Sequence, residues 1–185
     1  MSDPNWELNI DAHTELLERL EALEYILGEK GRNPLFCIGI NPSTAEPNCL
    51  DSTVNKVKNI SLKNNYDGWV MLNIYPQRAT NPKELDNYCK TENHRKNIDF
   101  IKKYLGKYEK PIIWAAWGIL IEKRPYLFNC LKDIYEETKK YNSKWITFGN
   151  ITKKGHPRHP LYLTLNSKKF DFDIISYIQK NTKTE

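Results

Sequence analysis

Four short, continuously apolar segments alternate with segments of helical periodicity, and this alternation constrains the fold more than any other feature of the sequence. The apolar segments span residues 35–40, 68–75, 111–117 and 145–151. A strand that is apolar on both faces belongs in a sheet covered on both sides, which is typical of parallel sheets. We therefore predict an α/β fold with three layers, α/β/α, around a central four-stranded parallel sheet.

Helical patterns occupy the rest of the chain. We predict an amphipathic helix over residues 11–27 that ends at Gly28, and a helix capped by Asp51 or Ser52 that runs to about residue 65. Further helices are predicted from Asn81-Pro82, over residues 92–105, after Gly118 with an interruption or kink near Pro125, and over residues 171–179. The 185 residues suit one domain, 1–185, in which residues 1–30 form an N-terminal helix that packs on the remainder.

The composition restricts the compartment and the partners. The net charge of +5 fits a polyanion such as DNA, but many enzymes are equally basic. No apolar run approaches the roughly 20 residues of a membrane span, and the polar N-terminus shows no signal peptide. The four cysteines are scattered without a Cys-x-x-Cys pair, which indicates free thiols in a reducing compartment. We expect a cytoplasmic monomer with no membrane contact, no metal and no cofactor.

Several unusual residues stand at the ends of the predicted strands, where ligands bind in open parallel sheets. The segment Gly39-Ile40-Asn41-Pro42-Ser43 follows the first strand. Gly39 lets a ligand or backbone approach closely, Pro42 stiffens the turn, and the Asn41 amide can orient a water molecule. The alternative is an ordinary tight turn built from common turn-forming residues.

The second and third strands each end in a residue with two interpretations. Asn73 lies in an apolar strand, so its amide either bonds to loop backbone or contacts the edge of a nucleobase. Trp114 and Trp117 are three positions apart and should face opposite sides of the sheet. One of them belongs to the core, and the other either joins the core or forms a ligand wall.

The most unusual segment is Gly155-His156-Pro157-Arg158-His159-Pro160, which is too rich in proline for regular structure. A metal site on the two histidines is disfavoured because no carboxylate cluster accompanies them. A histidine can instead stabilise a developing negative charge, and Arg158 can pair with a phosphate. Arg78 follows the second strand and either contacts phosphate as well or bonds to loop carbonyls.

Taken together, these segments resemble a bacterial family, domain of unknown function 1643 (DUF1643). The resemblance covers roughly residues 34–165 and rests on five motifs. These are Asn41 to Ala45, Asp51 with Thr53, Asn73 with Arg78 to Leu85, Ala115 to Gly118, and Gly155 to Tyr162.

The same segments distantly resemble the uracil-DNA glycosylase superfamily in their order and spacing. That resemblance implies a glycosylase-like fold in which Asn41 holds the attacking water and His156 or His159 stabilises the departing base. It assigns base contacts to Asn73, which reads the edge of the base, and to the surrounding positions Gly39, Ile40, Pro42, Ser43, Tyr75 and Trp117. Arg78 and Arg158 would hold phosphates of single-stranded DNA or of DNA with a flipped base.

Three functions follow as hypotheses. The first is recognition of a nucleobase in DNA, with hydrolysis of the N-glycosidic bond. The second is a catalytically inactive relative that binds nucleic acid or a protein partner. The third is an enzyme acting on free nucleotides or nucleosides. Salt-dependent DNA binding without cleavage would distinguish the second, and stabilisation by mononucleotides but not by DNA would distinguish the third.

Overall fold

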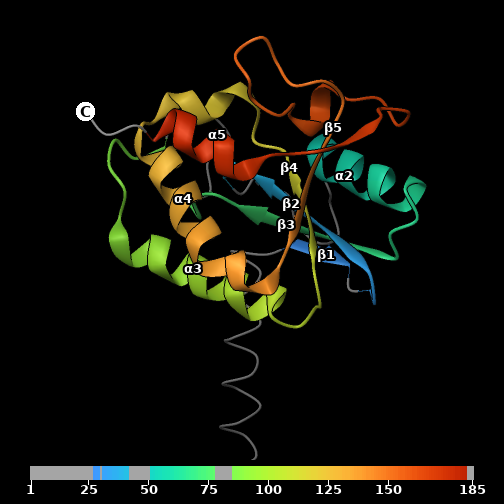
Figure 1. Ribbon diagram of the computed structural model, residues 1–185, viewed down its shortest axis with the longest axis horizontal. Coiled ribbons are helices and arrows are strands. Elements are labelled where there is room, and N and C mark those ends of the chain that lie inside the picture. Colours follow the sequence, from blue (N-terminus) through green and yellow to red (C-terminus); the bar gives the residue numbers. More distant parts are fainter. Residues whose placement is uncertain (1–26, 30, 42–50, 78–84, 183–185) are drawn as a thin grey trace, which may run out of the picture.

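The computed structural model in Figure 1 describes residues 27–29, 31–41, 51–77 and 85–182. Its strands are β1 (Leu27–Glu29), β2 (Pro34–Gly39), β3 (Gly68–Asn73), β4 (Ile112–Ala115), β5 (Lys144–Phe148) and β6 (Lys169–Asp171). Its α-helices are α2 (Ser52–Lys63), α3 (Thr91–Leu105), α4 (Tyr126–Thr138) and α5 (Ile174–Asn181). Short 3₁₀ segments are η2 (Gly118–Lys123), η3 (Lys139–Tyr141) and η4 (Pro160–Tyr162). The prediction of a mixed α/β fold is confirmed.

The strands form one six-stranded mixed sheet in the order β1-β3-β2-β4-β5-β6. The inner strands β3, β2, β4 and β5 pair in parallel, whereas β1 and β6 pair antiparallel at the two edges. The four predicted strands correspond to β2, β3, β4 and β5 and do pair in parallel, but the prediction was wrong for the complete sheet, which has six strands and is mixed. It missed the edge strands because each has only three residues and β6 is exposed throughout, so neither carries an apolar run.

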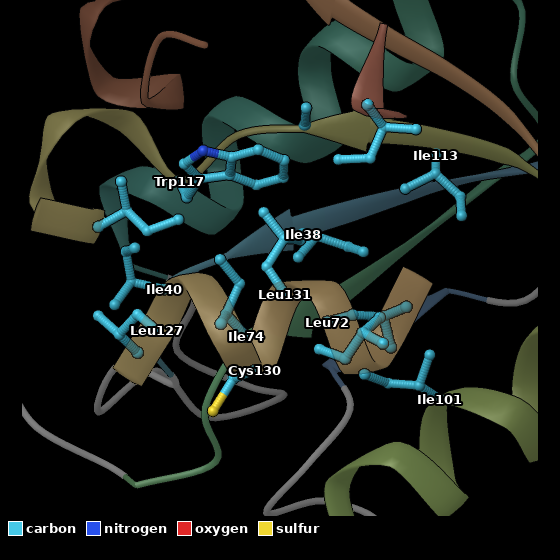
Figure 2. Packing of buried hydrophobic residues seen from close by; sticks show 14 of the residues in the cluster. Ile38, Ile40, Leu72, Ile74, Ile101, Ile113, Trp117, Leu127, Cys130 and Leu131 are labelled. Carbon is cyan, nitrogen blue, oxygen red and sulfur yellow. The ribbon is translucent and has the colours of Figure 1, made fainter. Parts of the chain in front are cut away.

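The inner strands are continuously apolar because both of their faces are covered. Phe36 and Ile38 of β2 belong to a hydrophobic cluster that includes side chains of α3, α4 and α5. Leu35 and Cys37 belong to a second cluster with Val54, Val57 and Ile60 of α2. Figure 2 shows the first cluster, in which Leu127 and Leu131 of α4 lie beneath Ile40 and Ile38.

The helix ends follow local chemistry. The Asp51 side chain accepts a hydrogen bond of 2.8 Å from the Val54 amide and caps α2, as predicted. Of the two alternatives predicted after Gly118, the helix is interrupted: η2 ends at Lys123, and Pro125 immediately precedes α4. Asp173 caps α5 in the same way, through a 3.0 Å bond from the Ser176 amide.

The amino-terminal segment departs from expectation where the structure describes it. Leu27 lies in β1, and Gly28 pairs with Val70. A Cβ on Gly28 would collide with the Trp69 carbonyl oxygen. The glycine therefore allows β1 to approach β3 closely, and it does not end a helix. Residues 11–26 of the predicted amino-terminal helix and the start of the helix predicted from Asn81 lie outside the described residues. Within the described residues, no helix has both the length and the apolarity that a bilayer crossing requires.

Candidate functional site at the carboxyl edge of the sheet

Three of the predicted motifs end side by side at the carboxyl edge of the parallel strands. Gly39 is paired with Asn73, and Ile38 is paired with Ala115. Beyond these pairs, the Ile74 amide donates to the Gly39 carbonyl at 3.0 Å, and the Ala116 amide donates to the Ile38 carbonyl at 3.0 Å. The edge thus places the turn at Asn41, which is half-buried, beside the ends of β3 and β4.

Asn73 connects two of these strand ends. It is 4% exposed, and with its amide nitrogen as donor it bonds to the carbonyls of Asn41 at 3.1 Å and Leu72 at 3.2 Å. Asn97 of α3 donates in turn to the Asn73 carbonyl at 2.9 Å. A Cβ on Gly39 would lie 2.5 Å from the terminal methyl carbon of Met71 and 3.3 Å from the Asn73 side chain, so there is little room for a larger residue here. The structure therefore agrees with the first interpretation of Asn73, in which its amide bonds to loop backbone.

Two predicted base contacts are interior residues instead. Trp117 is fully buried in the cluster that includes α4 and α5, where Trp145, Phe172 and Tyr177 surround its ring. Trp114 is equally buried in the other cluster, so the two tryptophans do face opposite sides, but both are core residues. Tyr75 is fully buried too, and its hydroxyl accepts a 3.0 Å bond from the Lys90 amide. Neither ring offers a surface for a base to stack on.

His156 is held inside a continuous chain of hydrogen bonds. The Trp117 indole donates to the Tyr177 hydroxyl at 3.0 Å, and this hydroxyl lies 2.7 Å from Nδ1 of His156. Nε2 of His156 lies 3.1 Å from Glu122, which also accepts a bond of 2.6 Å from Lys154. Because the Glu122 carboxylate can only accept, Nε2 of His156 donates to it, and in the neutral ring Nδ1 then accepts from the Tyr177 hydroxyl.

This series of hydrogen bonds gives His156 a structural role. The side chain is 2% exposed, and both of its ring nitrogens have protein partners. It ties the Gly-His-Pro segment to η2 and α5. The bond from Lys154 and then the bond from His156 lower the pKa of Glu122, which keeps this carboxylate charged at the outer end of the chain. The sequence carries no local signal for Glu122 or Tyr177, because they lie 34 and 21 residues from His156.

His159 is placed differently. It is half-buried, and its Nδ1 accepts a bond of 3.4 Å from the Leu161 amide. In the neutral ring the proton then lies on Nε2, which leaves that nitrogen as a donor. Desolvation by burial lowers the pKa of His159, with Asp51 at the start of α2 opposing the shift. Of the two histidines, His159 is the one whose neutral ring can offer a donor to a ligand.

Gly118 makes room for His159. It adopts a left-handed conformation with φ of 65°, and a Cβ there would lie 3.0 Å from the Cβ of His159. The Gly118→Ala variant is expected to lose about 1–3 kcal/mol of unfolding free energy, from the backbone strain and the displaced loop. Chemical denaturation would measure this loss. A variant as stable as the wild type would show that the contact between the two segments is loose.

A family described as "Protein of unknown function (DUF1643)" matches residues 22–161, which is more than half of the chain. The chain belongs to the DUF1643 family. The resemblance stated from the motifs is thus confirmed, and the DUF1643 match includes Asn41, Asn73, Gly118 and both histidines. No curated protein and no solved structure matched the chain.

The loop that carries His159 in this DUF1643 protein also presents apolar and basic groups to solvent. Leu161 is 47% exposed and Tyr162 is 77% exposed, so two large side chains with apolar area face solvent close to His159 in the sequence. Arg158 is exposed, and its Nε donates to the Asn150 carbonyl at 2.9 Å. Further exposed cations on this part of the chain are Lys153, Lys154, Lys168 and Lys169. Pro42, Ser43 and Arg78, predicted to contact base or phosphate, lie outside the described residues.

A separate hollow of about 230 Å³ lies at the opposite, amino edge of the sheet in the DUF1643 chain. Arg32, Pro34, Lys107, Tyr108 and Ile112 contribute to its walls. None of the predicted site residues lines it. We therefore assign the candidate site to the carboxyl edge, where parallel α/β sheets bind their ligands.

Proposed function

We propose that this protein recognises a nucleobase in DNA at the carboxyl edge of its sheet, with a three-layer fold of the uracil-DNA glycosylase type, and hydrolyses the N-glycosidic bond. The observation that carries the proposal is the placement of His159. A half-buried imidazole with lowered pKa offers a neutral N–H donor at the edge where β2 ends and the turn at Asn41 follows. No metal or cofactor enters the chemistry.

In the proposed reaction, the bond between C1′ of the sugar and the base nitrogen breaks, and the electron pair leaves with the base. The Nε2–H of His159 donates to the base oxygen on which negative charge grows, which lowers the barrier most where water is excluded. Water held by the Asn41 side chain bonds to C1′, and its proton is released to solvent. Asn73 acts as a positioning residue, because its amide holds the backbone of Asn41.

The exposed apolar groups beside His159 fit the requirement for an extruded base. A base in a duplex must leave the stack before its glycosidic bond is accessible. Leu161 or Tyr162 would fill the vacated space or stack on a neighbouring base, and Arg158 with the nearby lysines would contact phosphates.

The test is incubation of the purified protein with uracil-containing single-stranded and duplex oligonucleotides, followed by alkaline cleavage of abasic sites. Release of uracil that depends on Asn41 and His159 is expected. An oligonucleotide with thymine in place of uracil is the control for base selectivity. Absence of abasic sites under all salt and strand conditions would contradict hydrolysis.

A binding protein without catalysis is the second candidate, and the burial of Asn73, Tyr75 and Trp117 favours it. Three of the residues that would enclose a base have exposed fractions of 4%, 0% and 0%. This candidate predicts salt-dependent affinity for DNA without abasic products. Thermal stabilisation by mononucleotides but not by DNA would instead indicate an enzyme acting on free nucleotides.

Tyr162 provides a prediction common to the first two candidates. Loss of one stacked aromatic costs about 1–3 kcal/mol per base, so Tyr162→Ala should weaken single-stranded DNA binding about 10-fold. Fluorescence anisotropy of a labelled oligonucleotide would measure it. Tyr88→Ala is the matched control, because Tyr88 is also well exposed, at 69%, but precedes α3 on the other face of the sheet. Equal losses in both variants would argue against a specific surface at η4.

A further inference from the structure

A second group of reactive side chains lies away from the carboxyl-edge site. Cys89 precedes α3, His94 lies in the first turn of α3, and Cys130 lies on α4. The two sulfur atoms and one ring nitrogen of His94 all lie within 4.8 Å of one another. Figure 2 shows the Cys130 sulfur at the margin of the hydrophobic cluster, away from Ile38 and Trp117.

The two sulfur atoms have the spacing of metal-bound thiolates. Sγ of Cys89 and Sγ of Cys130 are 3.7 Å apart. Two thiolates at about 2.3 Å from a tetrahedral zinc ion would be about 3.8 Å apart. A disulfide would require a separation of about 2.05 Å, and therefore movement of the chain.

His94 adds a buried nitrogen that lacks a partner. The side chain is 7% exposed, and its Nε2 lies 3.1 Å from the Asp133 carboxylate. Its Nδ1 is buried and has no hydrogen-bond partner within the described chain. A buried polar atom without a hydrogen-bond partner lowers the unfolding free energy by about 1–3 kcal/mol. Metal-binding histidines commonly donate their second N–H to a carboxylate, as Nε2 of His94 is placed to do.

The surrounding backbone holds these groups in place without a ligand. Arg124 bonds the carbonyls of Leu85 and Asp86 at 2.8 to 3.1 Å, and Tyr75 accepts from the Lys90 amide. The segment containing Cys89 is thereby fixed against η2 and the end of β3. Cys130 and Asp133 are three residues apart on α4, so they lie on the same side of that helix.

We propose that Cys89, His94 and Cys130 form a zinc site in which Nδ1 of His94 is the nitrogen ligand and Asp133 orients the ring. A thiolate and imidazole set selects zinc over magnesium or calcium, and two thiolates neutralise its charge. The fourth position is open to water. Because thiols bind zinc as thiolates, zinc binding releases their two protons to the solvent. The site links the segment before α3 to α4 and departs from the expectation that no cysteine binds metal.

The test uses the full-length protein, reduced with a phosphine and stripped of metal with a chelator. Titration with cobalt(II) should give one equivalent bound, with a sulfur-to-cobalt charge-transfer band and the visible bands of a tetrahedral site. Zinc should displace the cobalt and raise the melting temperature. Cys89→Ser, at the half-buried position, and His94→Ala should each weaken cobalt binding at least 100-fold.

Cys37→Ala is the matched control, since Cys37 is a buried free thiol in the other cluster. It should retain the full cobalt spectrum. A wild-type protein without the charge-transfer band overturns the proposal, as does undiminished binding in Cys89→Ser. Loss of two titratable thiols on mild oxidation, with no metal uptake in the reduced protein, would identify a redox pair instead and also overturn it.

Discussion

His156→Ala is expected to lower the unfolding free energy by about 2–4 kcal/mol, because it removes a buried side chain and leaves the Tyr177 hydroxyl without its acceptor. In a chain of this size the melting temperature should fall by roughly 5–15 °C. Nδ1 and Nε2 both have protein partners, so this histidine joins the loop to α5 and η2. Chemical denaturation followed by far-ultraviolet circular dichroism measures the loss.

A double-mutant cycle with Tyr177→Phe tests the cause of that loss. Removing the hydroxyl takes a partner from both the Trp117 indole and the imidazole of His156. The two substitutions should therefore be non-additive by about 1 kcal/mol or more. A His156→Ala variant of native stability that had lost activity would contradict the structural role and would make His156 the functional histidine.

His159→Ala should have the opposite profile, with a change in unfolding free energy below about 1 kcal/mol and a large loss of function. Removing one hydrogen-bond donor to a developing anion typically lowers the rate about 10²- to 10³-fold. We expect the rate of uracil release to fall by a factor in that range. His156→Ala, assayed well below its melting temperature, is the control in the same loop. Unchanged uracil release in His159→Ala would refute the proposed role of His159.

The pH dependence gives a second readout for His159. Its pKa is lowered in the folded chain, chiefly by burial. Above about pH 6.5 the ring is neutral in both the folded and the unfolded state, and below it the unfolded chain binds the proton first. The unfolding free energy should therefore fall as the pH drops below 6.5. Part of this dependence of the unfolding free energy on pH should be absent in His159→Ala. An identical pH dependence in the variant would show that groups other than His159 cause the loss of stability.

The sequence alone determined the alternation of strands and helices, and hence the carboxyl edge as the place to look for a candidate site. Continuous apolar runs such as residues 35–40 need cover on both faces, and the structure provides it with α2 on one side and α3, α4 and α5 on the other. The Asp51 cap was also predictable, because capping is a contact between residues three positions apart.

Only the tertiary structure decided what individual polar and aromatic residues do. Asn73 and His156 were each compatible with a ligand or with a protein partner, and long-range contacts with Asn41, Tyr177 and Glu122 satisfy them inside the chain. Trp117 and Tyr75 were candidates for stacking until packing buried them.

The cluster of Cys89, His94 and Cys130 was hidden for the same reason. Cys130 lies 41 residues from Cys89, and the packing of α3 against α4 brings them together. Periodicity and capping act over a few residues, so the sequence displays them directly. A hydrogen bond or a shared site between distant residues depends on how the layers pack, and that information resides in the folded chain.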